Sequence, residues 1–137
     1  MTKWTNEAIV EWHKKAFPNA TKETQLKKVE DELQEMSDAL DDLLFKRTTD
    51  DTKAIEEVAD VYIASVALFS RFDSRLGALA LNYIMYIENE MIKEARQGVP
   101  NAAIKLRETI NAKMDKNAKR TWHETTPGYY QHVETVQ

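Results

Sequence analysis

Two pairs of acidic residues have the spacing that could place four carboxylates around one cation. Glu32 and Glu35 stand three residues apart in a helical pattern. Glu57 and Asp60 have the same spacing in the next helical pattern. Residues three apart lie on adjacent turns of a helix, so each pair presents two carboxylates on one side. If the two helices form an antiparallel hairpin, the four carboxylates converge into an all-oxygen site suited to Mg²⁺ or Mn²⁺.

A simpler interpretation of each pair stays open. Acidic residues on an amphipathic helix usually form a solvated face, and the helix of Glu32 carries several others. Asp60 is the only charged residue between Val58 and Ser70. A lone carboxylate on an apolar helix is costly to bury unless it is paired or binds a metal. Asp60 therefore either belongs to a cation site or pairs with a lysine of a neighbouring helix.

Other kinds of site are disfavoured by what the sequence lacks. A di-iron carboxylate bundle needs a histidine three residues after a glutamate, and His13, His123 and His132 do not have this spacing. Cysteine is absent, which excludes disulfides, thiolate zinc sites and cysteine nucleophiles. Three glycines are too few for a Walker-type phosphate loop, and the net charge of −4 disfavours binding to a nucleic acid polymer.

Positive charge gathers near the end of the last helical pattern, in the segment KMDKNAKR. Lys113 and Arg120 could hold phosphate oxygens, and Asn117 could hydrogen-bond a substrate. The alternative is structural, because basic residues at a helix C-terminus are stabilised by the helix dipole. Trp12, near the N-terminus, could stack on a nucleobase, although large aromatic residues in a small helical domain more often belong to the core.

The elements that must position these residues are predicted to be helices. Helix formers fill the chain between three glycines and three prolines, which indicates an all-α bundle of about five helices. Their approximate ranges are 6–17, 22–45, 52–72, 73–97 and 100–120. The third is apolar almost all round, which is typical of a central helix. Residues 1–120 are expected to form one domain, and 121–137 an irregular or loosely docked tail.

The most apolar stretches, 58–69 and 76–87, are too short to span a membrane. The first residues carry charges where a signal peptide would have its apolar core. We therefore expect a soluble, cytoplasmic protein.

The acidic motifs and the basic segment together resemble the all-α nucleoside triphosphate pyrophosphohydrolases, the MazG-like and dCTP-pyrophosphatase-like enzymes. The pattern of this superfamily is E-E-x-x-E followed by E-x-x-D, which stands here as DELQE at 31–35 and EVAD at 57–60. The segments ADVYIASVALFSRF and KMDKNAKR are similar to segments of the dCTP pyrophosphatase branch.

The resemblance implies that the four acids of the two pairs bind Mg²⁺, with Mn²⁺ as an alternative, and that the polar residues of KMDKNAKR face the nucleotide. It implies hydrolysis between the α and β phosphates of a nucleoside triphosphate, in a homodimer or homotetramer. Glu35 is then the candidate for accepting the proton of the attacking water.

Two features depart from the family pattern. Asp31 stands in place of the first glutamate, which keeps the charge on a shorter arm. Residues 74–111 form a largely helical insertion, an enlarged fourth helix, between blocks that are usually close together. This insertion leaves the pocket shape, the assembly and the substrate open. A catalytically silent helical oligomer that acts as a binding or regulatory module is the alternative function.

Overall fold

The computed structural model describes residues 3–45, 47–73 and 102–133, together with Arg75, Asn82 and Tyr86. The described elements, in chain order, are α1 (Asn6–Ala16), α2 (Lys22–Leu44), α3 (Thr52–Val66), the π-helix η1 (Ala67–Phe72), α5 (Ala102–Lys119), β1 (Trp122–Thr126) and β2 (Tyr129–His132). The fold is mostly helical, as predicted. The expected fourth helix lies almost entirely outside the described residues, and the count of five helices is therefore not tested.

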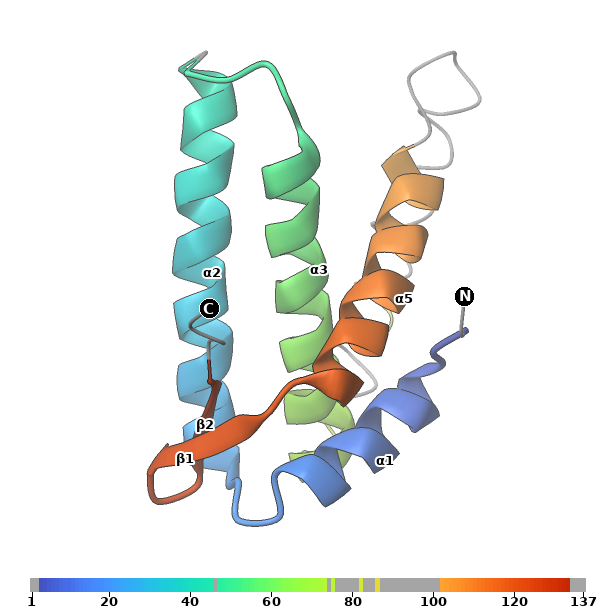
Figure 1. The fold of residues 1–137 in the computed structure, drawn as a ribbon, viewed down its shortest axis with the longest axis vertical. Coiled ribbons are helices and arrows are strands. Elements are labelled where there is room, and N and C mark those ends of the chain that lie inside the picture. Colours follow the sequence, from blue (N-terminus) through green and yellow to red (C-terminus); the bar gives the residue numbers. More distant parts are fainter. Residues whose placement is uncertain are drawn as a thin grey trace.

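The helix α3 is the central element, as its all-round apolar sequence predicts. It contacts α2 along one side and α5 along another, and α1 crosses near its C-terminal end (Figure 1). The helices α2 and α3 run antiparallel, which is the hairpin that the two acidic pairs require (Figure 1). None of the helices within the described ranges has the length and apolar character that crossing a membrane demands.

Two hydrophobic clusters hold α3 in place. The larger one lies between α1, α3 and α5 and includes the fully buried side chains of Ile9, Ile110 and Met114. The smaller one joins Val29 of α2 to Ala64 of α3 and to Leu68 of η1. Because these clusters cover different sides of α3, they fix its rotation and therefore the direction of its acidic residues.

The helix α2 starts where the sequence predicts. Its apolar residues, spaced by three and four from Leu26 to Leu43, form a stripe of which only part is buried. Thr21 is the N-cap, and it exchanges hydrogen bonds with Thr24 in a capping box. Along the stripe, Val29 is buried against α3, whereas Leu26 and Leu33 are more than 40% exposed. The apolar stripe is therefore wider than the surface that α3 covers.

A buried polar network ties the end of α1 to the other helices. Arg71 of η1 donates from Nη1 to His13 Nδ1 at 2.8 Å and to the Phe17 carbonyl oxygen at 2.9 Å. Since a guanidinium can only donate, His13 Nδ1 is an acceptor and the ring proton sits on Nε2. His13 Nε2 then donates to Gln25 Oε1 at 3.0 Å, and Gln25 Nε2 donates to the Ala64 carbonyl oxygen. The network works only with a neutral imidazole.

The C-terminal segment is a docked β-hairpin, so the prediction of an irregular tail is wrong for residues 122–132. The strands β1 and β2 pair antiparallel around a turn at Pro127 and Gly128. Gly128 has φ +80°, and a Cβ there would lie 2.7 Å from the Asn19 carbonyl oxygen, so a larger residue would clash. Tyr129 is buried, and its hydroxyl donates to Asp31 of α2. Sequence patterning missed the hairpin because its strands are short and few of their residues are β-branched.

The neutral state of His13 gives a first testable prediction. Burial, with help from the charge of Arg71, lowers the pKa of His13 from 6.5 to about 4. The unfolded chain binds this proton at the ordinary pKa, so the stability that depends on neutral His13 is lost as the pH falls from 6.5 through 4. We expect His13→Gln to remove about 2 kcal/mol of the stability difference between pH 7 and pH 4.5.

Urea unfolding of the wild type and the variant at both pH values measures this difference. His123→Gln is the control, because His123 is exposed on β1 and this variant should keep the wild-type pH dependence. An equal pH dependence in His13→Gln and the wild type would contradict a buried neutral imidazole.

Candidate functional site

A cavity of about 610 Å³ is lined by residues of α1, α2, α3, α5 and the hairpin. All the residues that the sequence indicates as site candidates line it: Trp12, Glu32, Glu35, Glu57, Asp60, Lys113, Asn117 and Arg120. They come from α1, α2, α3 and α5, with Arg120 directly after the end of α5, and the antiparallel pairing of α2 with α3 brings the two acidic motifs together.

Three of the four predicted acids form a compact carboxylate cluster. Glu32, Glu35 and Glu57 each have an oxygen within 4.8 Å of the other two. The side chain of Glu57 is 5% exposed and that of Glu32 is 13% exposed. One oxygen of each, Oε2, is buried and accepts no hydrogen bond from any residue that the structure describes. Buried carboxylate oxygens without a partner, in an all-oxygen cluster, fit a hard divalent cation such as Mg²⁺.

Asp60 lines the same cavity but stands outside this cluster. Its Oδ2 accepts a hydrogen bond from Lys113 Nζ of α5 at 3.2 Å, and both side chains are largely buried. This is the lysine pairing that the sequence left open as an alternative to a metal-binding role. The charge of Asp60 still acts on the cluster, because it contributes to the raised pKa of Glu32.

Two further lysines, which the sequence analysis did not single out, neutralise the cluster. Lys53 Nζ lies 2.6 Å from Glu57 Oε1, and Lys28 Nζ lies 3.5 Å from Glu32 Oε1. Each lysine stands four residues before its acid on the same helix, a spacing that was readable in the sequence. Together with Lys113 of α5 and Arg120 directly after that helix, they match the four acids in number, so the formal charges that line the cavity cancel.

Two of the acids nevertheless hold a proton more strongly than an ordinary carboxyl group, as their raised pKa values show. Burial raises the pKa of Glu32 from 4.5 to about 7; Lys28 opposes this effect, and Asp60 and Glu35 add to it. Burial also raises the pKa of Asp60, against the influence of Lys113. The carboxylates crowd one another in a poorly solvated place, so the lysines compensate their charge only in part.

Asn117 organises the basic side of the cavity. Its side chain is buried, and Oδ1 accepts a hydrogen bond from Arg120 Nη1 at 3.1 Å. Its backbone carbonyl accepts from Trp122 Nε1 at 3.0 Å. The predicted substrate-binding residue Asn117 therefore orients a cation and an aromatic ring, each of which lines the cavity.

The other end of the cavity has an aromatic wall. Trp12 packs edge-on against Phe17 and Trp122, with ring centroids 5.1 and 5.9 Å apart. Phe17 in turn stacks on Tyr130 of β2 at 4.8 Å. Trp12 also packs against the main core, so its core interpretation holds, and it lines the cavity as well. Tyr130 of this wall was missed in the sequence, where the only signal of the hairpin was a Pro-Gly turn followed by two tyrosines.

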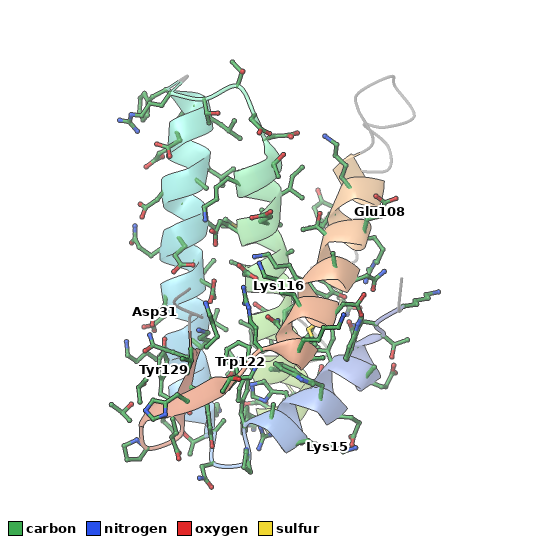
Figure 2. All side chains as sticks on the ribbon, in the orientation of Figure 1. Lys15, Asp31, Glu108, Lys116, Trp122 and Tyr129 are labelled. Carbon is green, nitrogen blue, oxygen red and sulfur yellow. The ribbon has the colours of Figure 1, made fainter. Side chains whose placement is uncertain are left out.

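Tyr129 fastens the hairpin to α2 beside the cluster. Figure 2 shows Tyr129 next to Asp31, and Trp122 where α5 passes into β1. The Tyr129 ring lies 5.3 Å from Lys27 Nζ and 5.6 Å from Lys28 Nζ, within cation–π range. Its hydrogen bond lowers the pKa of Asp31. Asp31 thus holds the hairpin against α2.

The raised pKa of Glu32 predicts how stability depends on pH without any metal. A carboxyl whose folded pKa exceeds its unfolded value destabilises the native state as the pH rises from 4.5 through 7. In chelator, Glu32→Gln should therefore raise the free energy of unfolding by about 2 kcal/mol more at pH 8 than at pH 5. Urea unfolding at the two pH values tests this expectation.

Glu30→Gln is the matched control, because Glu30 is an exposed acid on the same helix. It should change stability equally and little at both pH values. If Glu32→Gln behaves like this control, Glu32 does not sit in the poorly solvated cluster described above.

Comparison of the chain with protein-family models, curated proteins and solved structures finds no match. What the site does is therefore argued from its own residues and geometry.

Proposed function

We propose that the protein is a Mg²⁺-dependent, MazG-like nucleoside triphosphate pyrophosphohydrolase, which converts a (d)NTP and water into a (d)NMP and pyrophosphate. The observation that carries the proposal is the carboxylate cluster of Glu32, Glu35 and Glu57, in which two buried oxygens have no hydrogen-bond partner among the described residues. A solvated acidic face would not bury carboxylate oxygens in this way. Mn²⁺ would suit the same oxygens.

The charges around the cluster favour a ligand that carries both positive and negative charge. The cavity is lined by acids and lysines of α2 and α3, and by Lys113 of α5 and Arg120 directly after it. Its volume of about 610 Å³ is in the range of small-molecule sites. A complex of a divalent cation with a triphosphate matches this arrangement, with the cation toward the acids and phosphate oxygens toward Lys113 and Arg120. The aromatic wall around Trp12 then offers ring surfaces for a base.

Held by the cluster, with Asp60 close by, Mg²⁺ would neutralise triphosphate charge and acidify a bound water. Glu35, the most exposed member of the cluster, accepts the proton of the attacking water in this proposal. Lys113 and Arg120 stabilise the negative charge that develops on the departing pyrophosphate. Asn117 keeps Arg120 in position through the hydrogen bond between their side chains. Assembly into homodimers or homotetramers and a cytoplasmic location rest on the sequence alone.

Metal binding should be visible in the stability of the protein before any activity is measured. A cation that binds only the folded state stabilises it by about 2.7 kcal/mol at a hundredfold excess over Kd. We expect Mg²⁺ or Mn²⁺ to raise the melting temperature of the wild type at constant ionic strength. Glu57→Gln should abolish this rise, because it removes a buried ligand, whereas Glu30→Gln should keep it. A rise of the same size in Glu57→Gln would place the bound cation elsewhere.

The reaction itself is tested with a panel of NTPs and dNTPs, in Mg²⁺ and in chelator. We expect monophosphate and pyrophosphate in Mg²⁺ alone. Glu35→Gln should lower kcat by about 100-fold or more with unchanged helical circular dichroism, as loss of a general base does. Glu30→Gln should retain turnover. Release of orthophosphate would contradict the proposed bond cleavage. Folded protein that yields no product from the panel would favour the silent binding module.

A further inference from the structure

We infer that Lys53 is a mobile counter-ion of the carboxylate cluster. In the cation-free protein it neutralises Glu57, and when a divalent cation takes that place it moves to the anionic oxygens of the bound ligand. This inference rests on the proposed function, because it assigns Lys53 a role in binding both the divalent cation and the anionic ligand of the same site.

The contact between Lys53 and Glu57 places an ammonium group beside a buried carboxylate, which needs a positive charge next to it. Lys53 Nζ lies 2.6 Å from Glu57 Oε1, while Glu57 Oε2 is buried and accepts no hydrogen bond from the described part of the chain. A carboxylate that is 5% exposed needs a positive partner to stay ionised. Lys53 supplies that charge, and the second oxygen stays open to another ligand.

Lys53 is also the cavity lysine with the greatest freedom to move. Its side chain is 71% exposed, whereas those of Lys28 and Lys113 are 28% and 16% exposed. Lys28 lies over the Tyr129 ring, and Lys113 is held against Asp60. Lys53 stands in the first turn of α3, and its ammonium group is at the end of a flexible four-carbon side chain. Leaving Glu57 therefore requires only rotation of its own side chain.

Electrostatics sets the direction of this movement. The two oxygens of one carboxylate are close together, so a divalent ion on Glu57 Oε2 repels the Lys53 ammonium on Oε1 and displaces it. The formal charges lining the cavity cancel before any ligand binds, so a bound cation leaves an excess of positive charge beside the displaced lysine. Phosphate oxygens held near the cluster are then its acceptors, and a lysine binds phosphate well as a point charge.

This role predicts opposite effects on the two ligands when the charge is removed. Lys53→Gln eliminates a competitor for Glu57, so the protein should bind a divalent cation more tightly. The same change removes a phosphate contact, so an anionic ligand should bind less tightly in the presence of saturating cation. An ordinary surface lysine would affect neither.

The first measurement is the Kd of Mn²⁺ for the protein alone, followed by electron paramagnetic resonance. We expect it to fall about threefold in Lys53→Gln, the size typical of a pair with one exposed partner. The second is the Kd of inorganic tripolyphosphate at saturating Mg²⁺, which should rise by about threefold or more. Lys53→Arg, which keeps the charge, should stay near the wild type in both measurements.

Lys27→Gln is the matched control. Lys27 also stands four residues before an acid, Asp31, at 3.4 Å, but this pair lies outside the cluster and the cavity lining. The control should leave both affinities unchanged. An unchanged or weaker affinity of Lys53→Gln for Mn²⁺ overturns the inference, and so does an unchanged affinity for tripolyphosphate. The Mn²⁺ measurement needs no turnover, so tighter Mn²⁺ binding in a protein that hydrolyses no nucleotide would refute the proposed function and support the counter-ion role.

Discussion

The burial of carboxylates between α2 and α3 is the constraint on which the rest of the structure depends. An ionised carboxylate taken out of water must regain its lost solvation from nearby positive charge, a proton or a metal. The protein provides a lysine for Glu32, Glu57 and Asp60, and it raises the pKa of Glu32 to about 7. Two buried carboxylate oxygens still have no hydrogen bond within the part of the chain that the structure describes, and a divalent cation would supply the missing partner.

The rotation of α3 decides whether this arrangement can exist. Ala59 and Ile63 pack into the main core, and Ala64 packs toward α2, so the helix cannot turn without exposing apolar surface. Glu57 and Asp60 then face the cavity between these two contacts. Hydrophobic packing on two sides of one helix thus positions charges that would not gather on their own.

The aromatic end of the cavity depends on segments far apart in the chain. Arg71 of η1 satisfies carbonyl oxygens at the end of α1 and holds the neutral His13, and Phe17 then stacks on Tyr130 of the hairpin. A π-helix places one extra residue in a turn, and such turns are frequent at functional sites. Here the π-helix carries the guanidinium that joins α1 to the cavity wall.

Local patterns in the sequence determined the helices and the acidic pairs. The three-and-four spacing of apolar residues predicts α2, and the almost all-round apolar sequence predicts α3 as a central helix. The i, i+3 spacing puts Glu32 beside Glu35. Only the tertiary structure decided which acids meet, because Asp60 pairs with Lys113 from a helix some fifty residues later, and Glu57 joins the cluster instead. It also decided that the hairpin lines the cavity, since its short strands are held in place by Tyr129 docking on α2. Helix periodicity and capping act within a few residues, whereas burial and charge pairing depend on which distant surfaces come together.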